Sequence, residues 1–382
     1  MSDVAELLAD LVRIDTTNPA LGAGAPGERE LARELARRLE ALDLEVDLWD
    51  VLPGRPNIVA RLRGSGRANG GPAPSLALCG HMDVVAATSP GAFEPAVRDG
   101  RMYGRGAADM KAGLAAALLA AEAIVESGEP LAGDLLIAGL VDEEWRSAGA
   151  AALPARYAPD AAVMVECTGL DVVTEHGGFA WFDVESRGIE AAGDDTEHGV
   201  DAITLLAPVL TGIGRLDAAL AARPPAAYGR GSVHASTIQG GDQYPVYPAC
   251  CTVGIERCLI AGETVARAQA EIDGLLAAAR AADPRFDGGS RMIVGREPAA
   301  LDPAGEIVAA VTSAAQHVLG RPPNVRGDMG WMDSGLLVEA GIPCVVFGPA
   351  GHGEHTADEW VELASVTTCA RALELTARTF CA

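Results

Sequence analysis

Positive charge is scarce in this chain of 382 residues. It contains 29 lysine and arginine residues against 53 aspartate and glutamate residues, so its formal net charge is −24. Nucleic acids and anionic membranes are bound through basic patches. The composition therefore argues against both as partners.

Segments that direct a chain into or across a membrane are also lacking. The N-terminus has no basic stretch followed by an apolar one, as a signal peptide has. The richest apolar segment, 112–123, contains Glu122 and is too short to cross a bilayer. We therefore expect a cytoplasmic protein. Its eight cysteines form no CxxC pair and lie mostly in apolar runs, which predicts reduced, buried thiols.

Several common catalytic signatures are missing as well. The sequence contains no HExxH, no GxxxxGK phosphate loop and no GxSxG elbow. These absences argue against the commoner zinc peptidases, the P-loop nucleotide-binding proteins and the serine hydrolases.

What the chain does contain is an alternation of apolar strands with helices of period 3.6, which predicts an α/β fold with a central mixed sheet. The strands are expected at 44–51, 57–62, 76–79, 134–141, 161–166 and 344–348. The helices are expected at 4–13, 28–42, 110–127 and 306–319, with a last one from Glu362.

Between 179 and 297 the pattern changes. The expected order is strand 180–186, helix 200–210, strands 232–238 and 251–258, helix 263–280 and strand 291–295. This strand-helix-strand-strand-helix-strand order is the ferredoxin-like α+β pattern. We therefore predict a catalytic domain made of 1–178 and 298–382, interrupted by an inserted domain at 179–297.

Five short stretches place acidic or imidazole side chains in apolar or glycine-rich surroundings. They are 80–83, 108–111, 142–144, 165–167 and 354–356. Together they supply two imidazoles and several carboxylates, which is the ligand set that two neighbouring divalent ions need.

Each of these residues alone has a simpler structural explanation. A single histidine such as His81 at a strand end is more often a hydrogen-bonded structural residue than a ligand. Asp109 follows a glycine-rich turn and could cap a helix. Glu143 and Glu144 could lie in a solvated loop, and His355 in a surface loop.

Three features favour the metal site over these explanations. Asp83 lies two residues after His81, so in an extended chain it faces the same way and can accept a hydrogen bond from the second imidazole nitrogen. Carboxylates that end buried strands, such as Glu166, are costly without a cation or a proton. All five stretches also fall at expected strand or helix ends, where open α/β sheets bind ligands.

In order along the chain, these motifs resemble those of the aminoacylase and acetylornithine deacetylase family of dinuclear zinc hydrolases, which includes succinyl-diaminopimelate desuccinylases and glutamate carboxypeptidases. The matching segments are 80–85, 104–113, 142–144, Glu166, 199–203 and 355–360. The resemblance covers essentially the whole chain.

The resemblance implies a role for each residue. Asp109 would bridge two zinc ions, or two cobalt ions. His81 and Glu166 would complete one ion's ligands, and Glu144 with His355 the other's.

It also implies how an amide bond is cleaved. Glu143 would act as general base on a metal-bridging water and then as general acid toward the leaving amine. Asp83 would hold the metal-bound imidazole. The substrate would be an N-acyl amino acid, a small peptide or a related amide, and the inserted domain would be a lid and a homodimer surface.

Three positions in the inserted domain depart from the family pattern. Ala192 stands where relatives carry a histidine that, in dimers, stabilises the oxyanion in the partner's site. Cys258 replaces an arginine that grips a substrate carboxylate, and Pro245 stands where many relatives have asparagine. Other side chains remain as substitutes: His198 and His234 for the oxyanion donor, and Arg230, Arg257 and Arg326 for the carboxylate.

Three explanations of Ala192 stay open. It is an engineered substitution, or a natural retuning for an unusual substrate or a biosynthetic step, or the mark of a metal-binding protein that hydrolyses poorly.

Overall fold

The computed structural model describes residues 3–67, 71 and 73–382. It divides into two compact units, one made of Met1–Thr174, Leu301–Arg326 and Met332–Ala382, and one made of Glu175–Ala300 and Gly327–Trp331. The segment Gly327–Trp331, which we expected in the catalytic domain, belongs to the second unit. The glycine-rich segment 64–71, between two strands of the sheet, lies partly outside the described residues.

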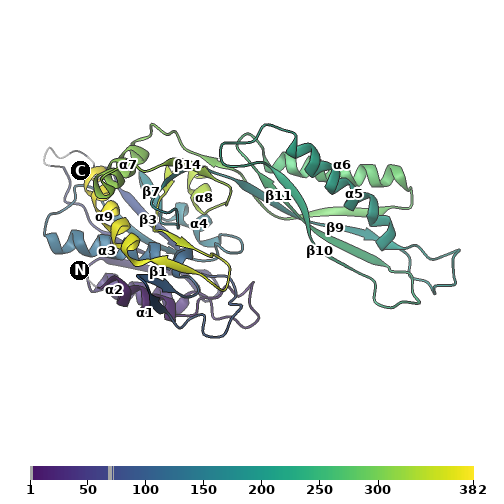
Figure 1. The fold of residues 1–382 in the computed structure, drawn as a ribbon, viewed down its shortest axis with the longest axis horizontal. Helices are drawn as coiled ribbons and strands as arrows, with labels where there is room; N and C mark the ends of the chain where they lie inside the picture. Colours follow the sequence, from purple (N-terminus) through teal and green to yellow (C-terminus); the bar gives the residue numbers. More distant parts are fainter. Residues whose placement is uncertain (1–2, 68–70, 72) are drawn as a thin grey trace. The chain divides into compact units, whose positions relative to one another are not determined.

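The first unit is built on a mixed sheet with the strand order β1-β2-β6-β3-β7-β15-β8 (Figure 1). Its strands are β1 (Glu45–Leu52), β2 (Arg55–Leu62), β3 (Leu76–His81), β6 (Leu135–Leu140), β7 (Ala161–Met164), β15 (Cys344–Val346) and β8 (Val172–His176). β3 pairs in parallel with both β6 and β7, whereas β2 pairs antiparallel with β6. The expected mixed α/β class is confirmed.

Helices cover both faces of this sheet because its central strands are buried on both sides. One face packs against α1 (Val4–Arg13), α2 (Arg29–Glu40), α3 (Ala112–Ser127), α7 (Glu306–Leu319) and α9 (Leu363–Phe380). The other packs against α4 (Ala148–Ala152) and α8 (Ser334–Glu339). Asp3 caps α1, since its carboxylate accepts hydrogen bonds from two backbone amides of the first turn.

A second, smaller sheet in this unit joins distant parts of the chain. Its order is β16-β17-β5-β4, with β4 (Ala96–Arg98), β5 (Arg101–Tyr103), β16 (Gly351–His352) and β17 (Trp360–Glu362). β17 pairs antiparallel with β5, so the loop between β16 and β17 lies beside the segment that follows β5.

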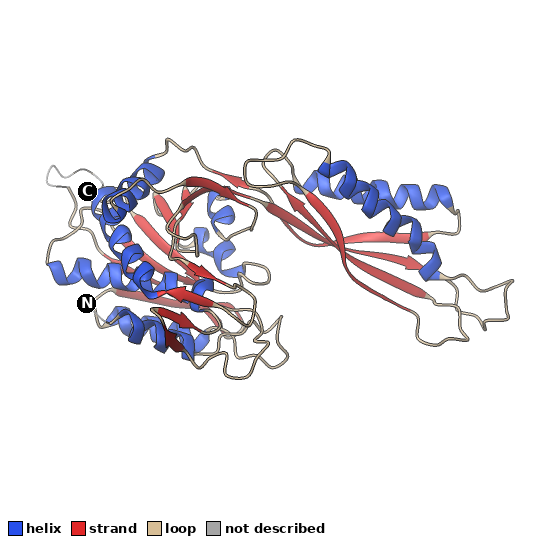
Figure 2. Cartoon of the chain, in the orientation of Figure 1, coloured by secondary structure: helices blue, strands red, loops and turns tan. Residues whose placement is uncertain are grey.

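The second unit has four antiparallel strands in the order β10-β11-β9-β12, with two helices on one face (Figure 2). The elements are β9 (Gly178–Arg187), α5 (Ala202–Ala221), β10 (Ser232–Gly240), β11 (Cys250–Leu259), α6 (Val265–Ala282) and β12 (Asp287–Arg296). They follow the expected ferredoxin-like order.

The helix α5 differs from our expectation because it continues past Leu210 to Ala221. By length and composition it is the single helix among the described residues that could cross a membrane. Its apolar residues Leu205, Leu206 and Val209 are buried in the core of the unit, so packing accounts for its composition.

Close packing of α3 on the sheet depends on a glycine. A Cβ added to Gly113 would lie 1.8 Å from the carbonyl oxygen of Val165. We expect Gly113→Ala to destabilise the protein by about 1–3 kcal/mol or more, because helix and strand must separate. The matched control is Gly274→Ala in α6, where a Cβ would meet no atom within 4 Å. It should stabilise by about 0.5–1 kcal/mol. Urea unfolding measures both changes, and equal stabilities would contradict the packing argument.

Candidate metal centre

Parallel pairing brings three of the expected site segments to one edge of the sheet. His81 ends β3, Glu143 and Glu144 follow β6, and Glu166 follows β7. Because β6 and β7 both run parallel to β3, their carboxyl ends meet at the same edge.

Asp109 reaches this edge from a turn that precedes α3. The turn spans Ala107–Lys111 and begins after Gly106, whose φ of 80° suits glycine. Asp109 and Met110 have non-helical backbone angles, so the helix expected from residue 110 starts at Ala112 instead. Asp109 therefore projects from an irregular turn, and it does not cap the helix.

His355 arrives on the loop between β16 and β17. Its φ of 63° lies in the left-handed region, which few non-glycine residues adopt. Its side chain is 58% exposed, whereas that of His81 is 1% exposed.

These side chains form two groups that share Asp109. Its Oδ1 lies 2.9 Å from Nε2 of His81, and Glu166 Oε1 lies 3.4 Å from the same nitrogen. Its Oδ2 lies 3.1 Å from Nε2 of His355, and Glu144 Oε2 is also 3.1 Å from that nitrogen. Within each group the ligand atoms lie within 4.8 Å of one another.

The donor set fits two divalent ions. Each group offers one imidazole nitrogen and two carboxylate oxygens, which are ligands that zinc accepts at about 2.0–2.2 Å. In tetrahedral coordination at that length, ligand atoms lie about 3.3 Å apart, close to the separations of 2.9 to 3.4 Å found here. Since its two oxygens face different imidazoles, Asp109 can bridge the two positions.

Burial and the neighbouring charges shift the pKa values of the side chains in this cluster strongly. Burial raises the pKa of Glu166 to about 8, and the nearby carboxylates add to the rise. Hydrogen bonds with Asp109 and Glu144 raise the pKa of His355 to about 10. Burial disfavours a charged His81, yet Glu166 and Asp109 together raise its pKa well above the ordinary value. Divalent cations relieve such carboxylate repulsion.

Glu143 lies beside the ligand groups and outside both of them. Burial raises its carboxyl pKa well above the usual range, and Asp333, Glu144 and Glu166 raise it further, while His81 opposes them. A carboxyl group with a raised pKa exchanges its proton closer to neutral pH, so it can act as a proton acceptor and then as a donor.

Asp83 holds this region differently from our expectation. Its backbone carbonyl, 3.0 Å from Nδ1, accepts from His81, whereas its carboxylate is 3.8 Å from that nitrogen. The carboxylate accepts instead from the amides of Glu143 and Glu144, each at 3.1 Å. The alternation of an extended strand does not continue past His81, where β3 ends, so the side chain of Asp83 turns toward the β6 loop.

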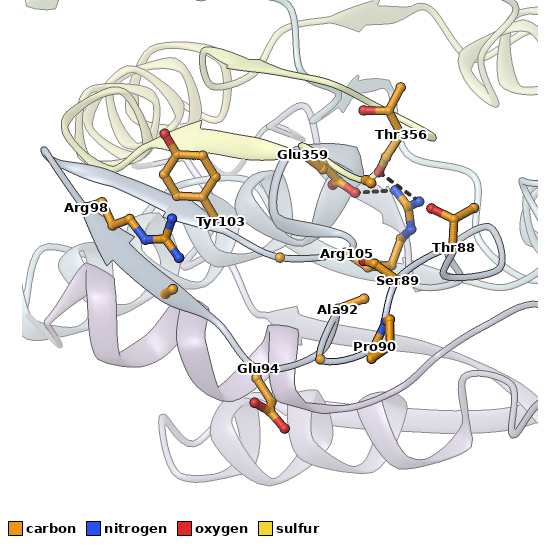
Figure 3. A pocket seen from close by; sticks show the side chains of 14 residues that line it. Thr88, Ser89, Pro90, Ala92, Glu94, Arg98, Tyr103, Arg105, Thr356 and Glu359 are labelled. Carbon is orange, nitrogen blue, oxygen red and sulfur yellow. Dashed lines mark hydrogen bonds and ion pairs between the residues drawn. The ribbon is translucent and has the colours of Figure 1, made fainter.

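A buried ion pair that sequence reasoning missed fixes the turn of Asp109. Arg105 donates to Glu359 at 2.5 Å and to the carbonyl of Thr356 at 3.1 Å (Figure 3). Glu359 also accepts from the backbone amides of Gly106, Ala108 and Asp109. This pair lines a cavity of about 160 Å³ that Thr88 and Ser89 also border.

Lys111 is the second feature that was missed. Its Nζ donates to the carbonyls of Leu11 and Ile14 at the C-terminal end of α1. Burial lowers its pKa to about 7. The signal was available in the sequence, because Lys111 is the only lysine of the chain.

Comparison with known proteins decides the relationship that the motifs predicted. The sequence pattern of Peptidase family M20/M25/M40 matches residues 77–379. The chain belongs to this family. The expected resemblance to deacylases and peptidases is confirmed, since curated relatives include succinyl-diaminopimelate desuccinylases and acetylornithine deacetylases.

One M20 relative is the N-formyl-4-amino-5-aminomethyl-2-methylpyrimidine deformylase of Bacillus subtilis, which is 29% identical over 94% of this chain and 92% of its own. A tripeptidase structure from Staphylococcus aureus matches with a TM-score of 0.80 at 20% identity, over 99% of this chain and 98% of that one. A structure from Bacillus subtilis described as a dinuclear metal-binding M20 peptidase matches with a TM-score of 0.69 at 17% identity, over 99% and 97%.

The substitute histidines in the second unit of this M20 chain are exposed. Ala192 lies in an exposed loop and forms a bridge with Val246. Nδ1 of His198 lies 2.8 Å from Asp195. His234 is 3.5 Å from Glu256.

The candidate arginines are engaged in ion pairs. Arg257 is fully buried, where its guanidinium pairs with Glu263 at 2.7 Å and Glu271 at 2.9 Å. It is therefore not available to a substrate carboxylate, which corrects our expectation for this residue. The other two also have partners, Asp217 for Arg230 and Asp171 for Arg326.

We expect metal-stripped protein to lose stability as the pH rises from about 5 to 8. The folded chain holds protons on Glu166, with a pKa of about 8, and on Asp83, with a pKa of about 7, that the unfolded chain releases near 4.5 and 3.8. His355 acts in the same direction, because its pKa is about 10 in the folded chain and 6.5 in the unfolded one. Calorimetric melting in the presence of a chelator measures the trend.

Zinc is the control for this experiment. Metal competes with protons for the same ligands, so the rise in melting temperature on adding zinc should be larger at pH 8 than at pH 5. Glu166→Gln removes one of the shifted carboxyls and should flatten the trend in chelator. A melting temperature that climbs with pH in the chelator would contradict these proton assignments.

Proposed function

We propose that this M20 protein is a two-metal amidohydrolase that cleaves the amide bond of an N-acyl amino acid, a small peptide or a related amide. The observation that carries the proposal is Asp109, whose two carboxylate oxygens face different imidazole nitrogens. This is the arrangement that a carboxylate shared by two ions requires. Zinc suits the mixed nitrogen and oxygen donors, and cobalt is the alternative.

Two sets of side chains are assigned to the two ions. His81, Asp109 and Glu166 would hold one ion, and Asp109, Glu144 and His355 would hold the other. Such a pair of ions polarises a carbonyl group and makes water more acidic.

Proton transfer is assigned to Glu143. Its carboxylate takes the proton of the attacking water and passes it to the leaving nitrogen, as its position beside the ligands and its raised pKa support. The names of the relatives, a deformylase among them, are consistent with a small acyl group on a primary amine.

The test of this assignment is Glu143→Gln. We expect turnover to fall by about 10²- to 10⁴-fold, because a general acid–base group contributes that much, while two ions per chain are retained. Glu144→Gln is the matched control and should lose metal. Turnover on N-acyl amino acids and metal content by elemental analysis are the measurements. Loss of metal from Glu143→Gln would reverse the two assignments, and a wild-type protein that binds less than one ion per chain and cleaves no amide would contradict the function itself.

A second candidate function is a family member that binds metal and ligand but hydrolyses poorly, or that works in a biosynthetic step. Ala192 supports it, because the family resemblance implies a histidine at that position. Removing one oxyanion donor costs about two to three orders of magnitude in turnover. Whether the residue is natural or engineered, the same experiment separates the two functions.

Ala192→His should raise turnover by about 10²- to 10³-fold if the site lacks only that donor. The position is exposed, so the change should alter the free energy of unfolding by no more than about 0.5 kcal/mol. His198→Ala in the parent is the control for a substitute donor. Unchanged turnover in Ala192→His, together with a large loss in His198→Ala, would show that His198 already supplies the donor.

We also propose a homodimer through the second unit and a cytoplasmic location. Strand β10 supports the dimer, since it lies at the edge of its sheet and its side chains beyond His234 are exposed, Ile238 at 54%. An edge strand of this kind can pair with another chain.

A further inference from the structure

The segment that carries Glu143 and Glu144 is held in an unusual backbone conformation. Asp142 has a φ of 74°, which costs free energy for a residue other than glycine. The backbone amides of the next two residues donate hydrogen bonds to one carboxylate. Glu143 N donates to Oδ1 of Asp83, and Glu144 N donates to Oδ2. The direction of both glutamate side chains therefore depends on where Asp83 lies.

Asp83 and Asp142 are both buried and both acidic, and one amide group lies between them. Nδ2 of Asn18 donates to Oδ2 of Asp83 at 2.7 Å and to Oδ1 of Asp142 at 3.1 Å. An amide nitrogen has two hydrogens, so each carboxylate receives one. Without this bridge, two buried carboxylates would face each other with one donor fewer apiece.

The orientation of Asn18 is itself fixed. The side chain is fully buried. Its Oδ1 accepts from the amide of Ala20 at 2.9 Å, and its own backbone amide donates to the carbonyl of Val84 at 2.9 Å. The amide oxygen is thus occupied, and only the nitrogen faces the carboxylates.

The guanidinium of Arg55 extends the network to Glu28. Nη1 of Arg55 lies 2.9 Å from Oδ1 of Asp142. The same guanidinium binds Glu28 through Nε at 2.8 Å and through Nη2 at 2.5 Å. Glu28 in turn accepts from the amide of Asp142 at 3.1 Å. Arg55 therefore holds the side chain of Asp142, and Glu28 holds its backbone amide.

We propose that Asn18 is a positioning residue for Glu143 and Glu144: its amide joins the carboxylates of Asp83 and Asp142 and so fixes the segment between them. The proposal rests on the proposed function for its effect on catalysis. Its effect on metal binding does not depend on which substrate the enzyme cleaves.

Asn57 provides a matched control. It is also a fully buried asparagine beside the same segment. Among the residues that the structure describes, its side chain bonds only to backbone, through Nδ2 to the carbonyl of Gly149 at 2.9 Å and through Oδ1 to the amide of Val141 at 3.1 Å. Its removal should therefore cost stability without changing the carboxylates around Asp83.

The experiment compares Asn18→Ala with Asn57→Ala in the full chain. We expect both to lower the melting temperature. Only Asn18→Ala should weaken zinc binding at the site that Glu144 completes, by about 10- to 100-fold, as loss of a partner behind a metal ligand does. Zinc affinity is measured by competition with a chromogenic chelator. With both sites saturated, kcat should fall by about 10- to 100-fold while KM changes less than about 3-fold.

The outcomes separate this inference from the proposed function. Zinc affinity and kcat in Asn18→Ala that equal those of Asn57→Ala would overturn the positioning role. A wild-type protein that binds two zinc ions but cleaves no amide would contradict the hydrolase, while the affinity comparison would still decide the role of Asn18. If Asn18→Ala does not fold, Asn18→Ser, which keeps one donor, must show an intermediate affinity, and wild-type affinity there would overturn the proposal.

Discussion

The carboxylate of Asp109 lies between two imidazoles, and the arrangement of the first unit follows from keeping it there. Its oxygens are 2.9 Å from His81 and 3.1 Å from His355. One histidine ends a strand of the large sheet and the other belongs to a loop of the small sheet. The side chain of Asp109 therefore joins a histidine from each sheet, although Asp109 itself lies in neither sheet.

Buried charge around that side chain is balanced residue by residue. Glu359, paired with Arg105, accepts hydrogen bonds from backbone amides of the turn that carries Asp109. Asp83 accepts hydrogen bonds from the backbone amides of Glu143 and Glu144. In both cases a carboxylate behind the site organises backbone amides in front of it, and an arginine or an asparagine neutralises or bridges that carboxylate. Removing one partner of such a network leaves a buried charge without a compensating partner, which destabilises the folded protein.

The sequence predicted the layers of the fold and the types of residue in the site, because both are local properties. Strand and helix ends are marked by glycine, proline and changes of period, and they placed the glutamates after β6 and β7 correctly. The contacts behind the site were not predictable, since Asn18 and Arg55 reach Asp142 from 124 and 87 positions away. The turn of Asp109 was mistaken for the start of a helix, because its irregular backbone is imposed by Glu359, 250 positions later.

Lys111 has a practical consequence for anyone handling this protein. It is the only lysine in the sequence, and its Nζ is buried against carbonyls at the end of α1. Amine-directed dyes, cross-linkers and surface couplings therefore have no lysine to attack on the folded chain. Lysine labelled with ¹⁵N at Nζ alone would give one resonance, from the side chain two residues along the chain from Asp109. A single spectral line could then report on the interior of this chain, without any mutation.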